Sequence, residues 1–444
     1  MTSTMMQSPL DRALSLSLSG EHEAALAIAG RFLQGALANP AALFLVGRTL
    51  SDLQELDLAN TAFELAIQQS LRSGNLPLAI AACRELERVG VDASAALATI
   101  TRTFAKGSES LADDHRAPPE ITQSLPTTAP FEETGSELLT RVAGVLSDAE
   151  ALLREVDEEP QVHVRVPFSS LEPEALAALI SAFEEVTVDT GYVLIEEGTP
   201  GSEAYVLARG ELEVRRRNRD PDAEPITLAR LGSGALFGEM ALLSRSPRAA
   251  SVVACRPSVV LCASKDALDA VAKAQPSVAA TLAQFTRRRM IDNLVRTSSI
   301  LSAVHVSKRA ALLDRFMTRT FEAGDRLITQ GEESTGLYLV ASGSLSVIHR
   351  SDDHVSDDDL AISKLGPGDV VGEVALVLRR PSNADVVAEH PTVTLHLPRD
   401  EFLDLVKAHP EVLAELYELA VKRDEETRSL VAQEATDVDE FILL

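Results

Sequence analysis

The sequence predicts an α+β protein, with an all-helical N-terminal region followed by two β-barrel domains of the jelly-roll type with flanking helices. Residues 8–105 are rich in Ala and Leu and place apolar residues at three- and four-residue spacing, as amphipathic helices do. From Val166 onward, short β-branched and aromatic runs alternate with Gly, Pro and Asp turns, which is typical of barrel strands. This strand-rich pattern occurs twice, so two barrels are expected.

The length of 444 residues exceeds what one hydrophobic core usually supports. We therefore divide the chain by its changes of composition. The expected parts are a helical region (1–105), a flexible linker (106–135), a connecting amphipathic helix (136–157), a first barrel domain (166–296), a second barrel domain (300–430) and an acidic tail (431–444).

The formal net charge is −26, with 67 acidic against 41 basic residues. Such a field repels DNA, RNA and anionic lipid at long range, so no nucleic-acid partner is expected. No uncharged apolar run of membrane-spanning length occurs, which predicts no membrane insertion. Three cysteines without CxxC spacing or a nearby His cluster indicate neither zinc nor a disulfide framework, so we expect a cytoplasmic protein without metal or cofactor.

The helical region contains a short internal repeat. GEHEAA (20–25) recurs as QELDLA (54–59), at the spacing of tetratricopeptide repeats, while GNLPLA (74–79) comes out of register. The segment resembles tetratricopeptide repeats, whose stacked helical hairpins leave a groove for another protein. This resemblance implies an unidentified protein partner of the N-terminal region, with an ordinary helical bundle as the alternative.

Pro, Ser, Thr and acidic residues without periodicity predict a flexible linker over 106–135. The next segment, from Ser136 to Val156, is expected to form one amphipathic helix with Ser136 as its N-cap. That helix could pack on the domain C-terminal to it or pair with another copy of the chain, so a homo-oligomer stays open.

The barrel sequences repeat in register. DTGYVLIEEGTPGSEAYVLARGELEV aligns without gaps with EAGDRLITQGEESTGLYLVASGSLSV, so that Gly191 corresponds to Gly324. After one inserted residue, LGSGALFGEMAL aligns with LGPGDVVGEVAL in a register that pairs Gly238 with Gly372. Gly191, Gly198 and Gly210 in the first copy are expected to form tight turns with positive φ.

The segment FGEMALLSRSPRAASV (237–252), which we term the first cassette, suits a cyclic phosphate. Gly238 lets the backbone come close, and the small Ala241 keeps the approach open. Unpaired N–H groups at the start of a short helix attract an anion, and the guanidinium of Arg248 completes the charge neutralisation. Glu239 is compatible with this site if it faces a sugar hydroxyl. The alternative is a solvated arginine and a surface carboxylate.

The pattern GExAL, a spacer and PRAA[ST]V resembles that of cyclic-nucleotide-binding domains, and the resemblance covers about residues 168–296. It implies that Arg248 binds the exocyclic phosphate oxygens and Glu239 the ribose 2′-hydroxyl. The amides of Gly238, Ala241 and Ala249 would bind the remaining oxygens. Ala249 lacks the hydroxyl that favours cGMP, so the implied ligand is cAMP.

The second copy of the motif, VGEVALVLRRPSNADV (371–386), is the second cassette and departs from the pattern. It keeps one glycine, the glutamate and one alanine, as Gly372, Glu373 and Ala375. However, Ser382, followed by Asn383, stands where the arginine is expected, and Asp385 replaces Ser251. Because a phosphate facing a carboxylate and no arginine is poorly compensated, a degenerate or altered second site is expected.

The resemblance also implies that the helix after the first barrel closes over the base, with Met290 or Leu294 as the cap. The sequence does not choose between the two. The alternative is that both side chains simply pack the helix against a barrel.

The sequence contains no P-loop, GxSxG, HExxH or kinase signature, so no enzyme is expected. We expect a cAMP receptor whose helical regions report ligand binding to a protein partner. The alternatives are a scaffold with degenerate barrels, and a protein whose helical repeats carry the main function. An acidic, short tail argues against a transcription factor, and the lack of an RRxS-like inhibitor segment in 106–165 counts against a kinase regulatory subunit.

Overall fold

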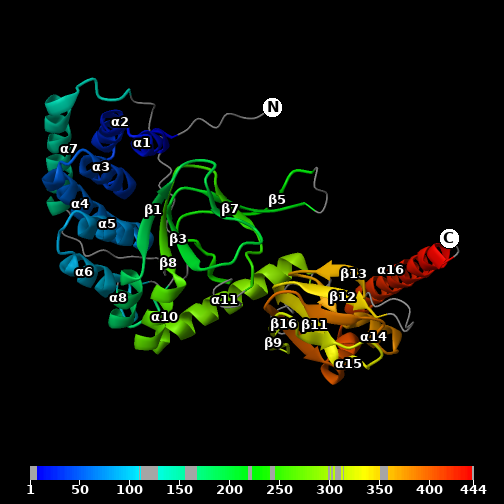
Figure 1. Ribbon diagram of the computed structural model, residues 1–444. Helices are drawn as coiled ribbons and strands as arrows, with labels where there is room; N and C mark the ends of the chain where they lie inside the picture. The colour runs from blue at the N-terminus through cyan, green and yellow to red at the C-terminus, as the bar shows by residue number, and fades with distance from the viewer. Residues whose placement is uncertain are drawn as a thin grey trace. The chain divides into compact units, whose positions relative to one another are not determined.

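The computed structural model describes residues 8–109, 111, 129–155, 168–218, 223–240, 246–298, 301, 304–305, 312–313, 315–350 and 359–442 (Figure 1). The chain divides into two compact units. The first comprises 1–197, 202–239 and 250–282, and the second comprises 198–201, 240–249 and 283–444. The first contains the helical region and most of the first barrel, and the second contains the second barrel.

The N-terminal region is helical, as the sequence predicts. Its helices are α1 Pro9–Leu18, α2 His22–Gly35, α3 Pro40–Asp52, α4 Leu56–Ser73, α5 Leu76–Arg88 and α6 Ser94–Phe104. Local chemistry explains where three of them begin: the side chains of Ser8, Asn39 and Asn75 accept hydrogen bonds from backbone N–H groups three residues later. A proline follows in the first turn of each, where its missing N–H costs nothing.

The structure explains why the internal repeat loses its register. Each copy of the motif supplies the turn before a helix, so that α2, α4 and α5 all begin at the third residue of a copy. Helix α3 lies between α2 and α4, whereas α5 follows α4 directly, after Gly74 ends α4 with φ 72°. The third copy therefore comes after a shorter interval than the second.

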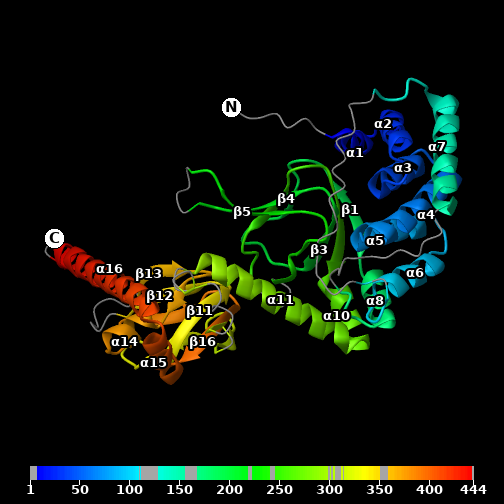
Figure 2. The same cartoon turned by 180° about the vertical axis from the view of Figure 1, so that it is seen from behind.

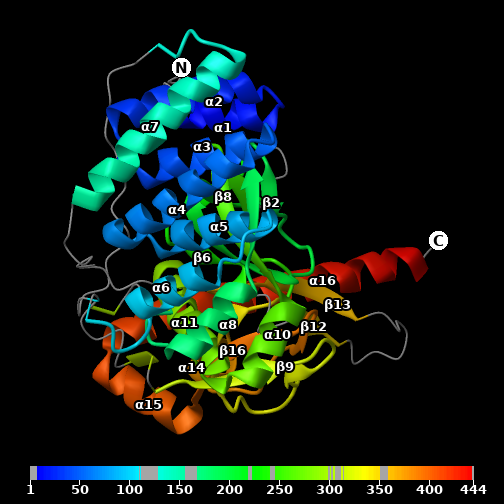
Figure 3. The same cartoon turned by 90° about the vertical axis from the view of Figure 1, so that its left-hand side faces the viewer.

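Helix α7 (Gly135–Glu155) packs along α2 and α4 (Figure 3). Its apolar face, which includes Leu138, Val142 and Leu146, is buried. The helix begins at Gly135, so Ser136 lies within the first turn and the prediction that it is the N-cap is wrong. Within the first unit the helix packs on the helical region rather than standing free.

The predicted linker is packed at its C-terminal end. Phe131 is buried against Gly30 of α2, and its backbone N–H donates to the carbonyl of Ala27 at 3.2 Å. The expectation of a flexible linker is therefore wrong for the residues around Phe131. The aromatic ring is buried against α2, and its packing holds the backbone of this segment in place. Residues 110 and 112–128 of the expected linker lie outside the described ranges.

The first barrel consists of two antiparallel sheets, in the strand orders β1-β8-β3-β6 and β2-β7-β4-β5. Its strands are β1 Glu184–Val188, β2 Val193–Ile195, β3 Glu203–Arg209, β4 Leu212–Arg216, β5 Ile226–Leu231, β6 Leu236–Phe237, β7 Ser251–Ala254 and β8 Ser258–Ser264. Helices α8 Pro173–Ser181, α10 Lys265–Ala274 and α11 Pro276–Thr297 flank them. The core between the sheets includes Leu207, Leu212, Phe237 and Val260.

The second barrel repeats this architecture, with the sheet orders β14-β11-β16-β9 and β10-β15-β12-β13. Its elements are β9 Met317–Phe321, β10 Arg326–Ile328, β11 Gly336–Ser342, β12 Leu345–His349, β13 Leu360–Leu365, β14 Val370–Val371, α14 Glu373–Leu378, β15 Asp385–Ala388, β16 Thr392–Pro398, α15 Arg399–Ala408 and α16 Pro410–Ile442. Helix α16 continues into the predicted acidic tail. The two-barrel, jelly-roll-type prediction is confirmed.

The helical region packs directly on the first barrel. Helix α5 contacts β1, β3 and β8, and Figure 2 shows it beside β1. The guanidinium of Arg48 on α3 lies 2.7 Å from the carboxylate of Glu185 on β1. Asp11 on α1 pairs with Arg209 at 2.6 Å and with Arg256 at 2.8 Å. Helix α5 is therefore covered by this protein's own sheet, and ion pairs join α1 and α3 to the same barrel.

Candidate functional site

The first cassette begins where β6 ends. Phe237 lies in the barrel core and stacks on Tyr205 with ring centroids 5.2 Å apart, which fixes the backbone just before the turn. Gly238 has φ 81°, a left-handed conformation that side chains with a Cβ rarely adopt. The chain then turns into a helix at Glu239, whose side chain is only 5% exposed. Ala241 lies outside the described residues.

The second half of the first cassette is held by backbone hydrogen bonds. The N–H of Arg248 donates to the carbonyl of Thr199, and the N–H of Gly198 donates to the carbonyl of Arg248, both at 2.8 Å. Gly198 is one of the predicted turn glycines, with φ 85°. Arg248 is 5% exposed, whereas Ala249 is exposed. A buried arginine in a fixed loop is what recognition of an anion requires.

The second cassette has the same backbone frame. The N–H of Ser382 donates to the carbonyl of Glu332, and the N–H of Gly331 donates to the carbonyl of Ser382, both at 2.8 Å. Gly372 has φ 89°, and a Cβ there would lie 2.6 Å from the carbonyl oxygen of Gly336. Residues that align in the two cassettes thus form the same pair of backbone hydrogen bonds in the structure.

The side chains on this second frame differ from those of the first. Ser382 is 8% exposed where the first cassette has Arg248, and Glu373 is 2% exposed and lies 2.7 Å from the guanidinium of Arg423 on α16. Asn383 donates to Asp424 of the same helix at 3.2 Å. Ala375 is buried in α14. Two of the predicted residues of the second site, Glu373 and Asn383, therefore contact the protein's own helix.

Asp385 corrects one interpretation of the sequence, that its carboxylate would face a phosphate. It accepts a hydrogen bond from the N–H of Gln330 at 2.6 Å and pairs with Arg350 at 2.8 Å and Arg326 at 3.3 Å. In the first barrel the equivalent bond runs from the N–H of Glu197 to the hydroxyl of Ser251 at 2.9 Å. Asp385 is thus a neutralised structural replacement for a serine.

The two candidate base caps lie in the second unit. Met290 is 7% exposed and Leu294 is 1% exposed, and both belong to a hydrophobic cluster with residues of the second barrel such as Leu337 and Phe402. This position agrees with the packing alternative. A capping role for either residue stays a prediction.

The sequence interpretation missed two residues of α16, Arg423 and Asp424. The signal was present, because the register that pairs Gly238 with Gly372 continues past the barrels and pairs Pro276, the first residue of α11, with Pro410, the first residue of α16. Extending the alignment along both helices would have pointed to these positions.

The ion pair between Asp424 and Arg380 joins α16 to the second cassette. Burial, and to a lesser degree the nearby Arg428, lowers the pKa of Arg380. The buried carboxylate of Asp424 thus lies beside a partly exposed guanidinium of the second cassette.

Within the described ranges, no group of three or more His, Cys, Asp or Glu side chains is placed to hold a metal ion. No helix in that part of the chain is both long and apolar enough to cross a membrane.

Residues 185–275 and 318–409 each match the cyclic nucleotide-binding domain family. The chain therefore carries two cyclic nucleotide-binding domains in tandem, as the cassette and the internal repeat predict. Over about half of its length it is similar to regulatory subunits of cAMP-dependent protein kinase. This similarity favours the receptor prediction over the scaffold alternative.

One such relative is the cAMP-dependent protein kinase type II regulatory subunit of Drosophila melanogaster, 30% identical over 246 residues, 55% of this chain and 59% of the relative. The cAMP-dependent protein kinase regulatory subunit of Yarrowia lipolytica is 30% identical over 239 residues, 54% and 58% of the two chains. This chain thus spans less than two thirds of the length of these relatives. The regulatory domain of Toxoplasma gondii PKA, solved with cAMP, is 28% identical, with coverage of 57% and 92% and a TM-score of 0.28.

Proposed function

We propose that this protein is a non-enzymatic receptor that binds a single cAMP in its first barrel and needs no cofactor. The observation that carries the proposal is that the two cassettes share one backbone arrangement but carry different side chains at one position. Both cassettes hold position 248 or 382 with the same pair of backbone hydrogen bonds, but only the first presents a buried arginine there. A buried guanidinium is stable when an anion or its equivalent compensates it.

The chemistry of the site follows from the residues at the two ends of the first cassette. The guanidinium of Arg248 would bind the exocyclic phosphate oxygens in a two-pronged contact. Glu239 would accept the ribose 2′-hydroxyl, and the amides of Gly238, Ala241 and Ala249 would donate to the remaining phosphate oxygens. Ala249 offers no hydroxyl to a guanine amino group, which supports cAMP over cGMP.

The output of such a receptor is a change in contact with a protein partner. Because α1, α3 and α5 cover the first barrel, the helical region would move with that barrel as one body and meet its partner through other surfaces. The relatives are regulatory subunits of a kinase, so a kinase catalytic chain is the partner class to test first. The three cysteines all lie in described parts of the chain and form no disulfide, which supports a reducing, cytoplasmic location.

The test is calorimetric titration of the full chain with cAMP and with cGMP. We expect one cAMP per chain and a weaker response to cGMP. Arg248→Ala should weaken cAMP binding about 30-fold or more, because truncating one partner of a buried charge pair costs several kcal/mol. Arg230→Ala is the matched control, since Arg230 is 61% exposed and pairs with Glu211 on the barrel surface.

Two results would reject the proposal. One is the lack of any cyclic-nucleotide binding by the wild type. The other is equal affinity in wild type and Arg248→Ala, which would mean that the nucleotide binds somewhere other than the first cassette.

A further inference from the structure

Helix α16 contacts the second cassette through two consecutive charged residues of opposite sign. Arg423 donates to a carboxylate oxygen of Glu373 at 2.7 Å and to the carbonyl of Val370 at 2.5 Å. Glu373 is almost fully buried, at 2% exposed, so the contact with Arg423 is made away from solvent.

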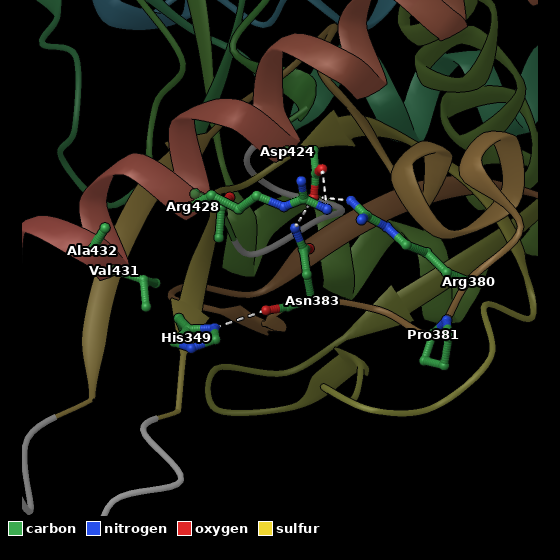
Figure 4. A pocket seen from close by; sticks show the side chains of 9 residues that line it. His349, Arg380, Pro381, Asn383, Asp424, Arg428, Val431 and Ala432 are labelled. Carbon is green, nitrogen blue, oxygen red and sulfur yellow. Dashed lines mark hydrogen bonds and ion pairs between the residues drawn. The ribbon is translucent and has the colours of Figure 1, made fainter. Parts of the chain in front are cut away.

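The next residue, Asp424, faces the other end of the cassette. Its carboxylate pairs with Arg380, accepts the side-chain amide of Asn383 at 3.2 Å and lies 3.2 Å from Arg428 one helical turn away (Figure 4). Asp424 is 7% exposed. The donors that the cassette directs toward α16 are thus matched by a carboxylate of the protein itself.

The first copy of the domain lacks this arrangement. The register that aligns the two cassettes pairs Arg289 with Arg423, but it pairs Met290 with Asp424 and Leu294 with Arg428. Met290 and Leu294 are apolar and lie in a hydrophobic cluster. The carboxylate and its cations are therefore specific to the second domain.

We propose that Asp424 is a built-in counter-anion of the second cassette, which holds α16 against the second barrel in the absence of any ligand. In the second domain α16 then stays packed over the cassette whether or not a nucleotide is present, so the domain does not change its conformation on binding. The second cassette carries Ser382 where the first has Arg248, and helix α16 brings the carboxylate of Asp424 to one of its arginines, Arg380. This inference goes beyond the proposed function and does not require that the first barrel bind cAMP.

Electrostatics also predicts what this helix excludes. Arg380, Pro381 and Asn383 of the cassette and Asp424, Thr427 and Arg428 of α16 help to line a cavity of about 380 Å³. An anion that entered the cavity would meet the carboxylate of Asp424 in its wall and would have to displace it from Arg380 and Asn383. A cyclic phosphate would therefore compete with the carboxylate of Asp424, which belongs to the same chain and is always near the cassette.

The test is amide hydrogen exchange of the full chain, followed over residues 420–431 of α16. In the wild type without nucleotide we expect this segment to be protected, and we expect saturating cAMP to leave its exchange unchanged. Asp424→Asn should raise the exchange about tenfold or more, because a hydrogen-bonded ion pair is lost. Glu425→Gln, which changes a neighbouring exposed carboxylate, is the matched control and should behave as the wild type.

Arg380→Gln provides a second variant, since Arg380 is 29% exposed and its replacement leaves the buried carboxylate in place. It should raise the exchange of α16 as Asp424→Asn does, and the double variant should add little to either single change. Equal exchange in wild type and both single variants would overturn the proposal. Protection of α16 that develops only after cAMP is added would also overturn it. Calorimetric binding of cAMP by the first barrel is scored separately, so the two proposals fail independently.

Discussion

Asp11 on the first helix and Arg209 at the end of β3 form a buried ion pair, 2.6 Å long, between residues 198 positions apart in the chain. Asp11 also contacts Arg256, which follows β7. One carboxylate thereby ties the first helix to β3 and to the loop between β7 and β8 of the first barrel. Burial lowers the pKa of Arg209 and Asp11 opposes this effect, so the carboxylate keeps the guanidinium charged.

Asp11→Asn should destabilise the first unit strongly. Removing one partner of a buried ion pair costs about 3 kcal/mol or more, because the other charge is left uncompensated. Urea denaturation monitored by circular dichroism would show the shift in midpoint. Asp57→Asn, on an exposed position of α4, is the control and should stay within about 0.5 kcal/mol of the wild type.

The stability of the helix–barrel contact should depend on pH through Glu85. Burial, and then the neighbouring Glu185 on β1, raises the pKa of Glu85 from 4.5 to about 7, while Arg48 and Arg88 oppose the rise. The folded protein therefore binds this proton more tightly than the unfolded chain does. The stabilisation is fully present below pH 4.5 and is lost as the pH rises through about 7.

Denaturation of the wild type between pH 5 and 8 should thus show stability falling by up to about 1.4 kcal/mol per pH unit from this group. Glu85→Gln should flatten that slope, whereas Glu64→Gln, an exposed position on α4, should keep it. An unchanged slope in Glu85→Gln would show that the carboxyl titrates as it does in the unfolded chain.

Two helical glycines should respond in opposite directions to Ala. Gly144 on α7 has open space where a Cβ would go, so Gly144→Ala should stabilise the protein by up to about 1 kcal/mol through higher helix propensity. A Cβ at Gly47 on α3 would lie 2.8 Å from the ring of Phe63, so Gly47→Ala should destabilise. Thermal unfolding of the two variants measures both effects, and a gain in Tm for Gly47→Ala would contradict the packing described.

Nucleotide choice should respond to position 249. Ala249→Thr adds a hydroxyl where a guanine amino group is expected, so the affinity for cGMP should rise about tenfold, the value of one hydrogen bond, while that for cAMP changes little. Competition titration with both nucleotides measures the ratio. Asn383 aligns with Ala249, so Asn383→Thr is the parallel change in the second domain and should leave the ratio as it is.

The sequence was sufficient for features that depend on local pattern. The strand texture and the constant register predict the two barrels, and Gly191, Gly198 and Gly210 have the positive φ expected of them, at 85°, 85° and 110°. That Gly238, Glu239 and Arg248 form one site also rests on their spacing in the sequence, and it stays a prediction.

Contacts between distant segments had no such signal. Nothing in the composition of residues 8–105 indicates that Asp11 and Arg48 pair with residues of the first barrel. An ion pair needs only one residue from each segment, so it leaves no periodic pattern in the sequence. The sequence predicts a flexible linker around Phe131 because one aromatic residue among polar ones forms no pattern. Its packing against α2 is visible only in the structure. Asp424 lies on α16, beyond the strand-rich repeat, so the register of the barrel strands alone does not reach it.

The equal backbone frames of the two cassettes have an evolutionary consequence. The bonds that shape the loop at position 248 or 382 run between main-chain atoms, so they do not depend on which side chain the loop carries. After duplication of such a domain, one copy can lose its ligand by a single codon change without any cost to its fold. A duplicated domain of this kind can therefore change what its loop binds while the loop keeps its shape.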